Sequence, residues 1–592
     1  MSLRAWAWLP GLLLPMLKAQ QPCAPTPLYD PCEITVEIPA AEAAKHPNPY
    51  LTIDLQAEMR SPKYKTYLVP AFWDGGRRLV IRFAPDEPGR WTYRLNSNLD
   101  GVDGTVQTFE AKESDAPGFI RPANMYHWRY TESLKAHLWM GDTMYRFASL
   151  ERPAFDQWVG DRAAQKFTHL RGTILPGDGL ATKAFPSADQ PNPEYFRELD
   201  ARLRSMNQKG LIADLVLSGD KNQLASLFPT YAQREKFIRF VAAHFASFNV
   251  TWQIARNFEN YDDGRDVMKQ LGLLLKKYDY YGHPRSTGST ATSTSMLPDG
   301  WVTHALHDSV DPAVGAVEHQ VYTVPFVATV STGAGSAAFR SRLWNYTMNG
   351  DYPSSTPDGT LDAAGIKAMT GWFELMSRTR WWDLYPYFDL EGGKALANPG
   401  VEYLVYLEKP GPVQVTIEKH EYQVYWMDPA SGEITKEKKD FKGELYEGSP
   451  PGNTHDWVLH LSRDGRKEGM AKSYRFESWP LPVQEVEVAP AKVPYELTAP
   501  PNHELATGKP VPYSIKLKRE TRATKAMQFV LLGEVVRDAQ GLRVLATGKE
   551  GTFTISPSLA KKYPATLSLR VYGLNGAGKL YAQDSLFQLK AE

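Results

Sequence analysis

One short stretch sets the architecture expected of this chain: Phe248-Asn-Val-Thr-Trp-Gln-Ile-Ala-Arg-Asn-Phe-Glu-Asn-Tyr261. Its apolar run, residues 250–255, predicts a buried strand, and the polar and aromatic residues after it predict a loop. Helical patterns flank this stretch at 231–248 and 266–278. Strands that alternate with helices in this way are typical of parallel sheets.

The alternation continues on both sides of this stretch. Further strands are expected at 137–140, 170–175, 211–217, 316–321 and 325–330, and further helices at 153–166, 193–209 and 339–345. Repeated strand–helix units over about 250 residues predict a (β/α)8 TIM barrel that spans 119–385. An open doubly wound sheet is the alternative, but no Gly-x-Gly-x-x-Gly fingerprint follows any expected strand.

The segments outside the barrel have the character of β-structure. Residues 30–118 alternate short strand-like runs (34–38, 51–55, 79–83 and 91–95) with turns, which predicts an antiparallel β-sandwich. Residues 480–501 are rich in Pro and Val and predict a linker. Four further strand-like runs within 502–592 predict another small β-sandwich, in which no site is evident.

The first 19 residues predict an export signal. Arg4 is followed by an apolar stretch, residues 5–16, that is too short to span a bilayer, and Leu17-Lys-Ala19 is a plausible cleavage site. An uncleaved anchor is the alternative. Cys23 and Cys32 are the only cysteines, and in an exported chain they are expected to form a disulfide. The protein is therefore expected to be secreted or periplasmic, with no membrane association once the signal is removed.

The composition of the chain limits the classes of binding partner and cofactor to be expected. The 67 basic and 67 acidic residues give a formal net charge of zero, so neither nucleic acid nor an anionic membrane is expected as a partner. Sixteen Trp residues fit carbohydrate binding, although buried cores explain most of them. The run His304-Ala-Leu-His-Asp308 lacks a third metal-ligand group at a suitable spacing, and no cofactor is expected. The sequence gives no indication of an oligomeric state.

Several stretches of the expected barrel resemble the apiosidase-like branch of the large (β/α)8 clan of retaining glycosidases. They are Met140-Gly-Asp-Thr143, Asp161-Arg-Ala-Ala-Gln-Lys-Phe167, Asn249-Val-Thr-Trp252, Asp279-Tyr-Tyr-Gly-His-Pro284 and Arg340-Ser-Arg-Leu-Trp-Asn-Tyr-Thr-Met-Asn-Gly350. Residues 72–76, 82–85 and 87–91 resemble the small sandwich that precedes many such hydrolases. Residues 381–461 resemble the sandwich that usually follows, labelled the collagen-binding domain of collagenases. The resemblance implies a barrel with one preceding β-sandwich and a second at 386–479, before the linker and the last sandwich.

The resemblance also implies where two catalytic carboxyls should lie. In this clan they follow the fourth and seventh barrel strands, and alignment places Asn257 and Val330 there. Retaining glycosidases hold the two carboxyls about 5–5.5 Å apart, one as nucleophile and one as acid/base. Neither an amide nor an isopropyl group can take these roles. Three explanations are open: the carboxyls have been relocated, the barrel binds glycans without cleaving them, or the alignment is shifted by a few residues.

The candidates for a relocated catalytic carboxyl, all near expected strand ends, are Glu259, Asp142, Asp220, Asp178 and Glu318. Glu259, in the loop after the fourth strand, is the best placed. Instead of a catalytic role, Glu259 could be a solvated loop residue or form an ion pair with Arg256. Asp142 could instead bind a sugar hydroxyl or order its loop. The predicted substrate-binding residues are Arg256, Asn257, Glu318, His319, Tyr322 and Asp220. The barrel mouth is expected to be a concave, aromatic-lined pocket that includes Asp142, Arg256, Asn257, Glu259, His319 and Tyr322. Instead of facing the mouth, Glu318 could point into the core and pair with a buried Arg.

The leading hypothesis from the sequence is a secreted protein that hydrolyses O-glycosidic bonds of a polysaccharide. A non-catalytic barrel that binds oligo- or polysaccharide is the alternative.

Overall fold

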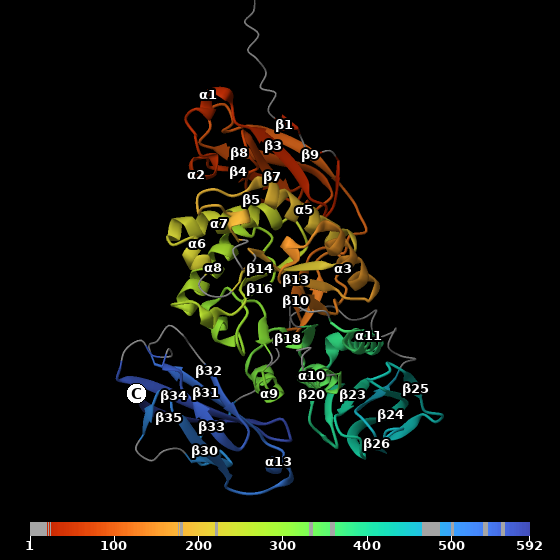
Figure 1. Ribbon diagram of the computed structural model, residues 1–592. Helices are drawn as coiled ribbons and strands as arrows, with labels where there is room; N and C mark the ends of the chain where they lie inside the picture. Colours follow the sequence, from red (N-terminus) through yellow and green to blue (C-terminus); the bar gives the residue numbers. More distant parts are fainter. Residues whose placement is uncertain are drawn as a thin grey trace, which may run out of the picture. The chain divides into compact units, whose positions relative to one another are not determined.

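The computed structural model describes residues 20–21, 23, 25–175, 177, 181–219, 223–308, 310–330, 336–355, 361–463, 486–498, 503–536, 543–557, 560 and 563–591. The chain forms two compact units, Met1–Glu113 and Ser114–Glu592. Figure 1 shows the elements coloured along the sequence. No helix within the described part of the chain combines the length and the apolar character that crossing a membrane requires.

The first unit is a β-sandwich of two sheets. One sheet has the order β1-β3-β7-β6 and the other β2-β9-β8-β4-β5. The strands are β1 (Gln20–Gln21), β2 (Thr26–Pro27), β3 (Cys32–Glu37), β4 (Leu55–Arg60), β5 (Thr66–Pro70), β6 (Phe72–Trp73), β7 (Arg78–Phe83), β8 (Gly89–Ser97) and β9 (Val106–Lys112), with short helices α1 (Ala40–Ala43) and α2 (Pro49–Thr52). Trp91 lies in the core, its ring centroid 4.9 Å from that of Phe83. Cys23 and Cys32 form a disulfide at the start of β3.

One strand expected in this unit, at 51–55, is wrong. The chain forms α2 there, and β4 begins only at Leu55. The side chain of Asn48 accepts a hydrogen bond from the backbone N–H of Leu51, and Pro49 occupies the first turn. These are helix-start features, and they outweigh the strand-like alternation of the residues that follow.

The second unit begins with a hairpin, β10 (Ile120–Ala123) and β11 (His127–Tyr130), and continues into eight parallel strands that form the predicted barrel. The barrel strands are β12 (Gly141–Thr143), β13 (His169–Leu175), β14 (Ile212–Ser218), β15 (Val250–Ala255), β16 (Arg285–Ser286), β17 (Ala305–Asp308), β18 (Phe326–Val330) and β19 (Tyr352–Ser355). The sheet order β16-β15-β14-β13-β12-β19-β18-β17 joins the first strand to the last. Between β16 and β17 the connection is a backbone hydrogen bond from Thr303 N to Arg285 O at 2.9 Å.

Helices follow the barrel strands and surround them (Figure 1). They are α3 (Arg152–Ala164), α4 (Ala181–Ala184), α5 (Pro193–Gln208), α6 (Gln223–Leu227), α7 (Tyr231–Phe245), α8 (Gly264–Tyr278), α9 (Pro312–Val321), α10 (Ser336–Met348) and α11 (Ala363–Ser377), with short 3-10 turns η1 (Phe147–Ser149), η2 (Phe258–Asn260), η3 (Thr294–Asp299) and η4 (Trp381–Asp383). Between β16 and β17 the described residues contain only η3.

Two expected barrel strands are wrong. The first barrel strand begins at Gly141 rather than spanning 137–140. Residues 316–321 belong to helix α9, and the sixth strand is β17. The side chain of Asp311 caps α9, and Pro312 occupies its first turn. An apolar run such as 313–317 cannot by its own period distinguish a buried strand from a buried helix, so this start signal was the informative feature.

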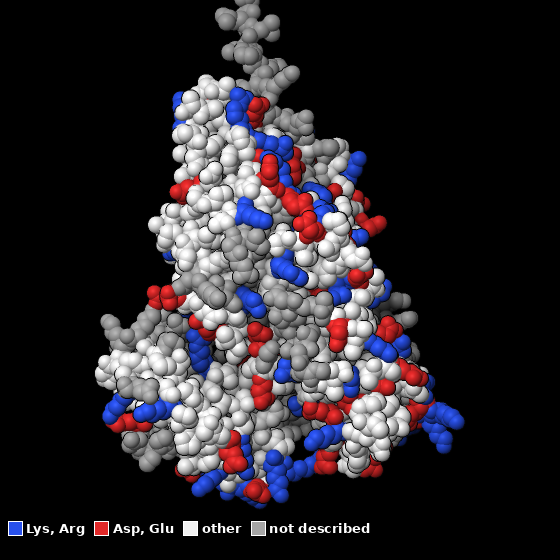
Figure 2. Space-filling view, viewed as in Figure 1, with Lys and Arg blue, Asp and Glu red and all other residues white. Residues whose placement is uncertain are grey.

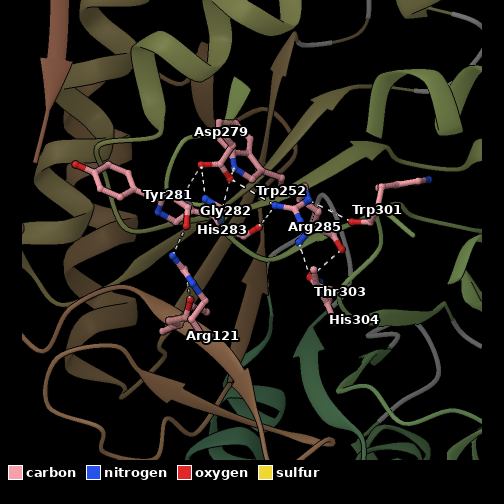
Figure 3. Close-up of polar contacts among 11 residues, drawn as sticks. Arg121, Trp252, Asp279, Tyr281, Gly282, His283, Arg285, Trp301, Thr303 and His304 are labelled. Carbon is pink, nitrogen blue, oxygen red and sulfur yellow. Dashed lines mark hydrogen bonds and ion pairs between the residues drawn. The ribbon is translucent and has the colours of Figure 1, made fainter. Parts of the chain in front are cut away.

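A buried ionic cluster supports the amino-terminal end of β15 and β16 (Figure 3). Asp279 accepts hydrogen bonds from Trp252 Nε1 at 3.2 Å and from the backbone N–H of His283 at 2.6 Å, and Arg285 Nη1 lies 3.8 Å from its carboxylate. Burial opposes the charge on Asp279, but His283 and Arg285 outweigh it and hold the pKa of the carboxyl below its usual value. At this end of a barrel such groups serve stability.

Two β-sandwiches follow the barrel. The first contains β20 (Tyr385–Tyr387), β21 (Leu390–Glu391), β22 (Lys394–Asn398), β23 (Glu402–Leu407), β24 (Val413–Met427), β25 (Ile434–Lys436), β26 (Phe441–Gly448) and β27 (Trp457–Ser462). The second, here called the C-terminal sandwich, contains β28 (Tyr495–Thr498), β29 (Glu504–Ala506), β30 (Pro510–Leu517), α13 (Arg522–Lys525), β31 (Gln528–Val535), β32 (Arg543–Thr547), β33 (Glu550–Thr554), β34 (Ala565–Leu574) and β35 (Leu580–Lys590), in two sheets.

The charged side chains are mixed over the surface. On the face shown in Figure 2, acidic and basic groups are interspersed, and neither sign forms a broad field of its own among the described residues. This agrees with the zero net charge of the chain.

Candidate active site at the barrel mouth

The carboxyl end of β15 carries the polar loop that the sequence placed there. Arg256 and Asn257 follow the strand directly, and Glu259 lies in the turn η2. The guanidinium carbon of Arg256 is 4.3 Å from the ring centroid of Tyr145, which follows β12. Three of the predicted site residues are therefore grouped at the end of the barrel where ligands bind in this fold.

Glu259 is held from three directions. Its carboxylate accepts hydrogen bonds from Ser289 Oγ and from the backbone N–H of Thr290, both in the loop after β16, and Arg543 Nη1 of the C-terminal sandwich lies 3.1 Å away. The side chain is 11% exposed. Burial raises the pKa of Glu259 above its ordinary value, although Arg543 and the two hydrogen bonds oppose that shift. The partner of this carboxylate is Arg543, not the neighbouring Arg256 that the sequence suggested.

A polar network fills the barrel interior below the mouth. Arg171 Nε donates to Asp214 at 2.6 Å, and Asp214 also accepts from Thr251 Oγ1 and Gln253 Nε2. Burial by itself would lower the pKa of Arg171, but the carboxylate of Asp214 outweighs burial. The pKa of Arg171 is therefore raised above its ordinary value, with smaller contributions from Tyr145 and Asp308. Arg171 Nη2 is buried without a hydrogen-bond partner.

Asp308 is a carboxyl that the sequence reasoning did not select. It ends β17, is partly buried, and accepts a hydrogen bond from Thr329 Oγ1 of β18. Its neighbour His307 contacts helix α9, so alternation along the strand directs Asp308 toward the barrel interior. The sequence signal for Asp308 lies in the run His304-Ala-Leu-His-Asp308, whose two histidines point to a metal site rather than to this carboxyl. In the described part of the chain, no three His, Cys, Asp or Glu side chains are grouped as metal ligands.

The two positions at which the resemblance expects carboxyls lie at the ends of β15 and β18. Asn257 precedes η2 without capping it through its side chain, and Val330 is the last residue of β18 and is fully buried. Neither side chain can donate or accept a proton in hydrolysis.

Asp142 does not face the mouth, contrary to expectation. Its carboxylate faces helix α3, where it accepts from Arg162 Nε at 2.5 Å and from Trp158 Nε1 at 3.1 Å, and it also accepts from Ser355 Oγ. The residue is 2% exposed. Successive side chains of a strand point to opposite faces, and at this position the outward face meets the helix layer. In this structure Asp142 forms a buried ion pair with Arg162 that supports the fold.

Glu318 and His319 lie on helix α9, because the sixth strand is not where the sequence placed it. Glu318 accepts from Thr292 Oγ1 and Thr294 Oγ1 and contacts His307 Nε2 at 2.9 Å. His319 is 3% exposed, and its ring stacks on Tyr126 with centroids 4.0 Å apart. Neither side chain belongs to the mouth. The alternative for Glu318, pairing with a buried Arg, is wrong: its ionic partner is His307.

His307 joins two buried carboxylates, since its Nδ1 also lies 2.9 Å from Asp351 Oδ2. Burial by itself would lower the pKa of His307, but Asp351 and Glu318 outweigh it and raise the pKa to about 10.

A folded-state pKa above the unfolded value stabilises the protein fully below the unfolded pKa, near 6.5, and the effect is lost as the pH rises through about 10. We therefore expect the free energy of unfolding of the parent, relative to that of His307→Gln, to fall by roughly 1.4 kcal/mol per pH unit across this window. Urea unfolding of both proteins between pH 6 and 10 measures the difference. A difference that does not change with pH would show that His307 is neutral in the folded protein.

Tyr322 directly follows α9 and lines a cavity of about 270 Å³ between the barrel and the C-terminal sandwich, not the mouth. Asp220, the last predicted binding residue, and Asp178, a candidate carboxyl, lie outside the described residues.

The comparisons with known proteins agree with this architecture. Residues 127–331 match the family model "Apiosidase-like, catalytic domain", and residues 26–98 match a domain of unknown function, DUF5060. No curated protein matches the chain. Neither family match extends beyond residue 331, so the similarity of residues 386–479 to the collagen-binding domain of collagenases stays a prediction.

Solved structures share the fold. A protein from Bacteroides vulgatus ATCC 8482, described provisionally as a glycoside hydrolase, is 18% identical with a TM-score of 0.62, and the match covers 74% of this chain and 99% of that one. Another, described as a glycoside hydrolase, is 13% identical with a TM-score of 0.51 and covers 59% of this chain and 98% of its own. At these identities the similarity establishes the fold.

Proposed function

We propose, from the premise that residues 127–331 belong to the apiosidase-like catalytic domain family, that this protein hydrolyses O-glycosidic bonds of a polysaccharide. The observation that carries the proposal is Glu259, a mostly buried carboxyl at the carboxyl end of the fourth barrel strand. Its pKa is raised by burial, as a group that donates a proton near neutral pH requires.

In this mechanism Glu259 protonates the departing glycosidic oxygen. Hydrolysis needs a second carboxyl that acts as a nucleophile or activates water, and Asp308 is our candidate because it lies at the carboxyl end of β17 beside β18. Arg256 and Asn257 flank Glu259 and are proposed to bind sugar hydroxyls. Tyr145, under the Arg256 guanidinium, offers an aromatic face at the same end of the barrel.

A second candidate function is glycan binding without cleavage. Asn257 and Val330, at the ends of β15 and β18, favour it because the resemblance expects catalytic carboxyls there.

A glycan panel separates the two candidates. We expect the parent protein to release reducing sugar from at least one plant or microbial polysaccharide, measured beside binding to the same polymers by affinity electrophoresis. Binding with no release from any polymer would reject the hydrolase and favour the silent barrel. Neither release nor binding would reject both.

We also propose that the protein is exported. The apolar stretch at 5–16 supports this, as does the disulfide between Cys23 and Cys32, a bond that persists in oxidising compartments.

A further inference from the structure

The C-terminal sandwich packs against the barrel through helix α9. Val314 and Val317 of the helix form one buried apolar cluster with Val530, Leu532 and Tyr572 of the sandwich. At the start of α9, Thr547 Oγ1 donates to Asp311 Oδ2 at 2.7 Å. This contact joins a side of the barrel wall to strands β31, β32 and β34.

From this position β32 reaches the loop that carries Glu259. Arg543, the first residue of β32, has its guanidinium carbon 5.2 Å from the ring centroid of Phe258. Its Nη1 is 3.1 Å from Glu259 Oε1, an ion-pair contact without the alignment of a hydrogen bond. The Arg543 side chain is 20% exposed, so water screens this contact only in part.

Arg543 is the cation that acts on this carboxylate. Burial disfavours the charged form of Glu259, and Arg543 is the largest of the opposing influences, ahead of the hydrogen bonds from Ser289 and Thr290. Those two donors belong to the barrel itself. The cation comes from a domain that begins more than two hundred residues later in the chain.

We propose that the C-terminal sandwich supplies Arg543 as a positioning residue for Glu259, so that barrel and sandwich together build the site. The inference rests on the proposed function. It gives the sandwich a role at the mouth: its cation fixes the orientation of the carboxylate and limits how far burial favours the neutral acid.

The test compares four proteins: the parent, Arg543→Gln, Arg543→Lys and the control Arg522→Gln. Arg522 lies on the same sandwich and pairs with Glu391 at 2.5 Å, so its variant also breaks an Arg–Glu pair between two domains but leaves Glu259 untouched. The pKa of Glu259 is measured by ¹³C NMR of glutamate side-chain carboxyls, with Glu259→Gln identifying the signal. Thermal melting checks that each variant folds.

We expect the pKa of Glu259 to rise by about one unit in Arg543→Gln, the lower end for loss of a neighbouring opposite charge. Arg543→Lys should restore much of the parent value, and Arg522→Gln should match the parent. On a cleaved glycan, the limb of the kcat/KM pH profile that Glu259 governs should move to higher pH by the same amount.

Two results would overturn the proposal: unchanged titration of Glu259 in Arg543→Gln, or an equal shift in Arg522→Gln, which would indicate a general effect of domain contacts. If no glycan is cleaved, the hydrolase proposal fails, and the titration still decides whether Arg543 controls Glu259. An Arg543→Gln protein that does not fold would shift the decision to Arg543→Lys. In Arg543→Lys the positive charge is kept, so a pKa of Glu259 raised by the full amount expected for loss of the cation would overturn the proposal.

Discussion

Glu259→Gln is expected to lower kcat on a cleaved glycan by at least about 100-fold, the lower end for losing a general acid or base. Glutamine keeps the shape of the side chain: its single amide oxygen can accept from the backbone N–H of Thr290, and its amide NH2 can donate to the Ser289 hydroxyl in place of the hydrogen bond that the carboxylate accepts. It cannot donate a titratable proton to the departing oxygen. Because the loop contacts are kept, the loss should appear in kcat while the melting temperature changes little. Initial rates on the polymer selected from the glycan panel measure it.

The matched control is Glu374→Gln on α11, an exposed glutamate paired with Arg378. This variant should keep the parent rate. Asp308→Asn should lower kcat comparably to Glu259→Gln if it is the second carboxyl. Parent-like turnover in Glu259→Gln would remove this residue from the mechanism and return the search to the other carboxyls at the mouth.

Asp142→Asn is expected to lower the free energy of unfolding by about 3–5 kcal/mol, the usual cost of breaking a buried ion pair from one side. The change leaves the guanidinium of Arg162 buried beside a neutral amide, and it also weakens the contacts with Trp158 and Ser355. Denaturant unfolding of both proteins measures the loss. Turnover per folded molecule should stay close to that of the parent, because the side chain faces α3.

A surface pair provides the contrast. Asp156→Asn removes the exposed partner of Arg152 on the same helix layer and should cost at most about 1 kcal/mol. If Asp142→Asn instead folded as stably as the parent but lost turnover, the assignment made from sequence, a catalytic carboxyl, would be restored.

The barrel could be predicted from the sequence where its local signals agreed. The strand at 250–255 has its predicted bounds, and α5 and α8 begin within two residues of theirs, because periodic apolar residues and boundary signals coincided there. Helix α9 was mistaken for a strand because residues 313–317 form an unbroken apolar run, which fits a buried strand as well as a buried helix. That single error placed Glu318, His319 and Tyr322 at the mouth, whereas in the structure Glu318 and His319 lie on α9 and Tyr322 directly follows it.

The site was less predictable than the fold for two physical reasons. Whether a strand residue points into the barrel or outward depends on the register of its strand. The observed bounds of β12 and β17 direct Asp142 outward and Asp308 into the barrel, so Asp308 replaces Asp142 as a candidate catalytic carboxyl. The partner of Glu259 depends on how two distant domains pack. No local pattern around residue 259 indicates Arg543.

The short wall between β16 and β17 has a consequence for how the barrel opens. Strand β16 has two residues, and its link to β17 is made through Thr303 and Ser286 rather than a ladder of strand pairs. Few hydrogen bonds must break to separate these strands, so the cylinder has a seam here at which local opening costs little free energy. Local opening of the fold would start along this seam. Backbone amide hydrogens there would exchange with solvent before those of β13 and β14, which lie in the most extensively paired part of the sheet.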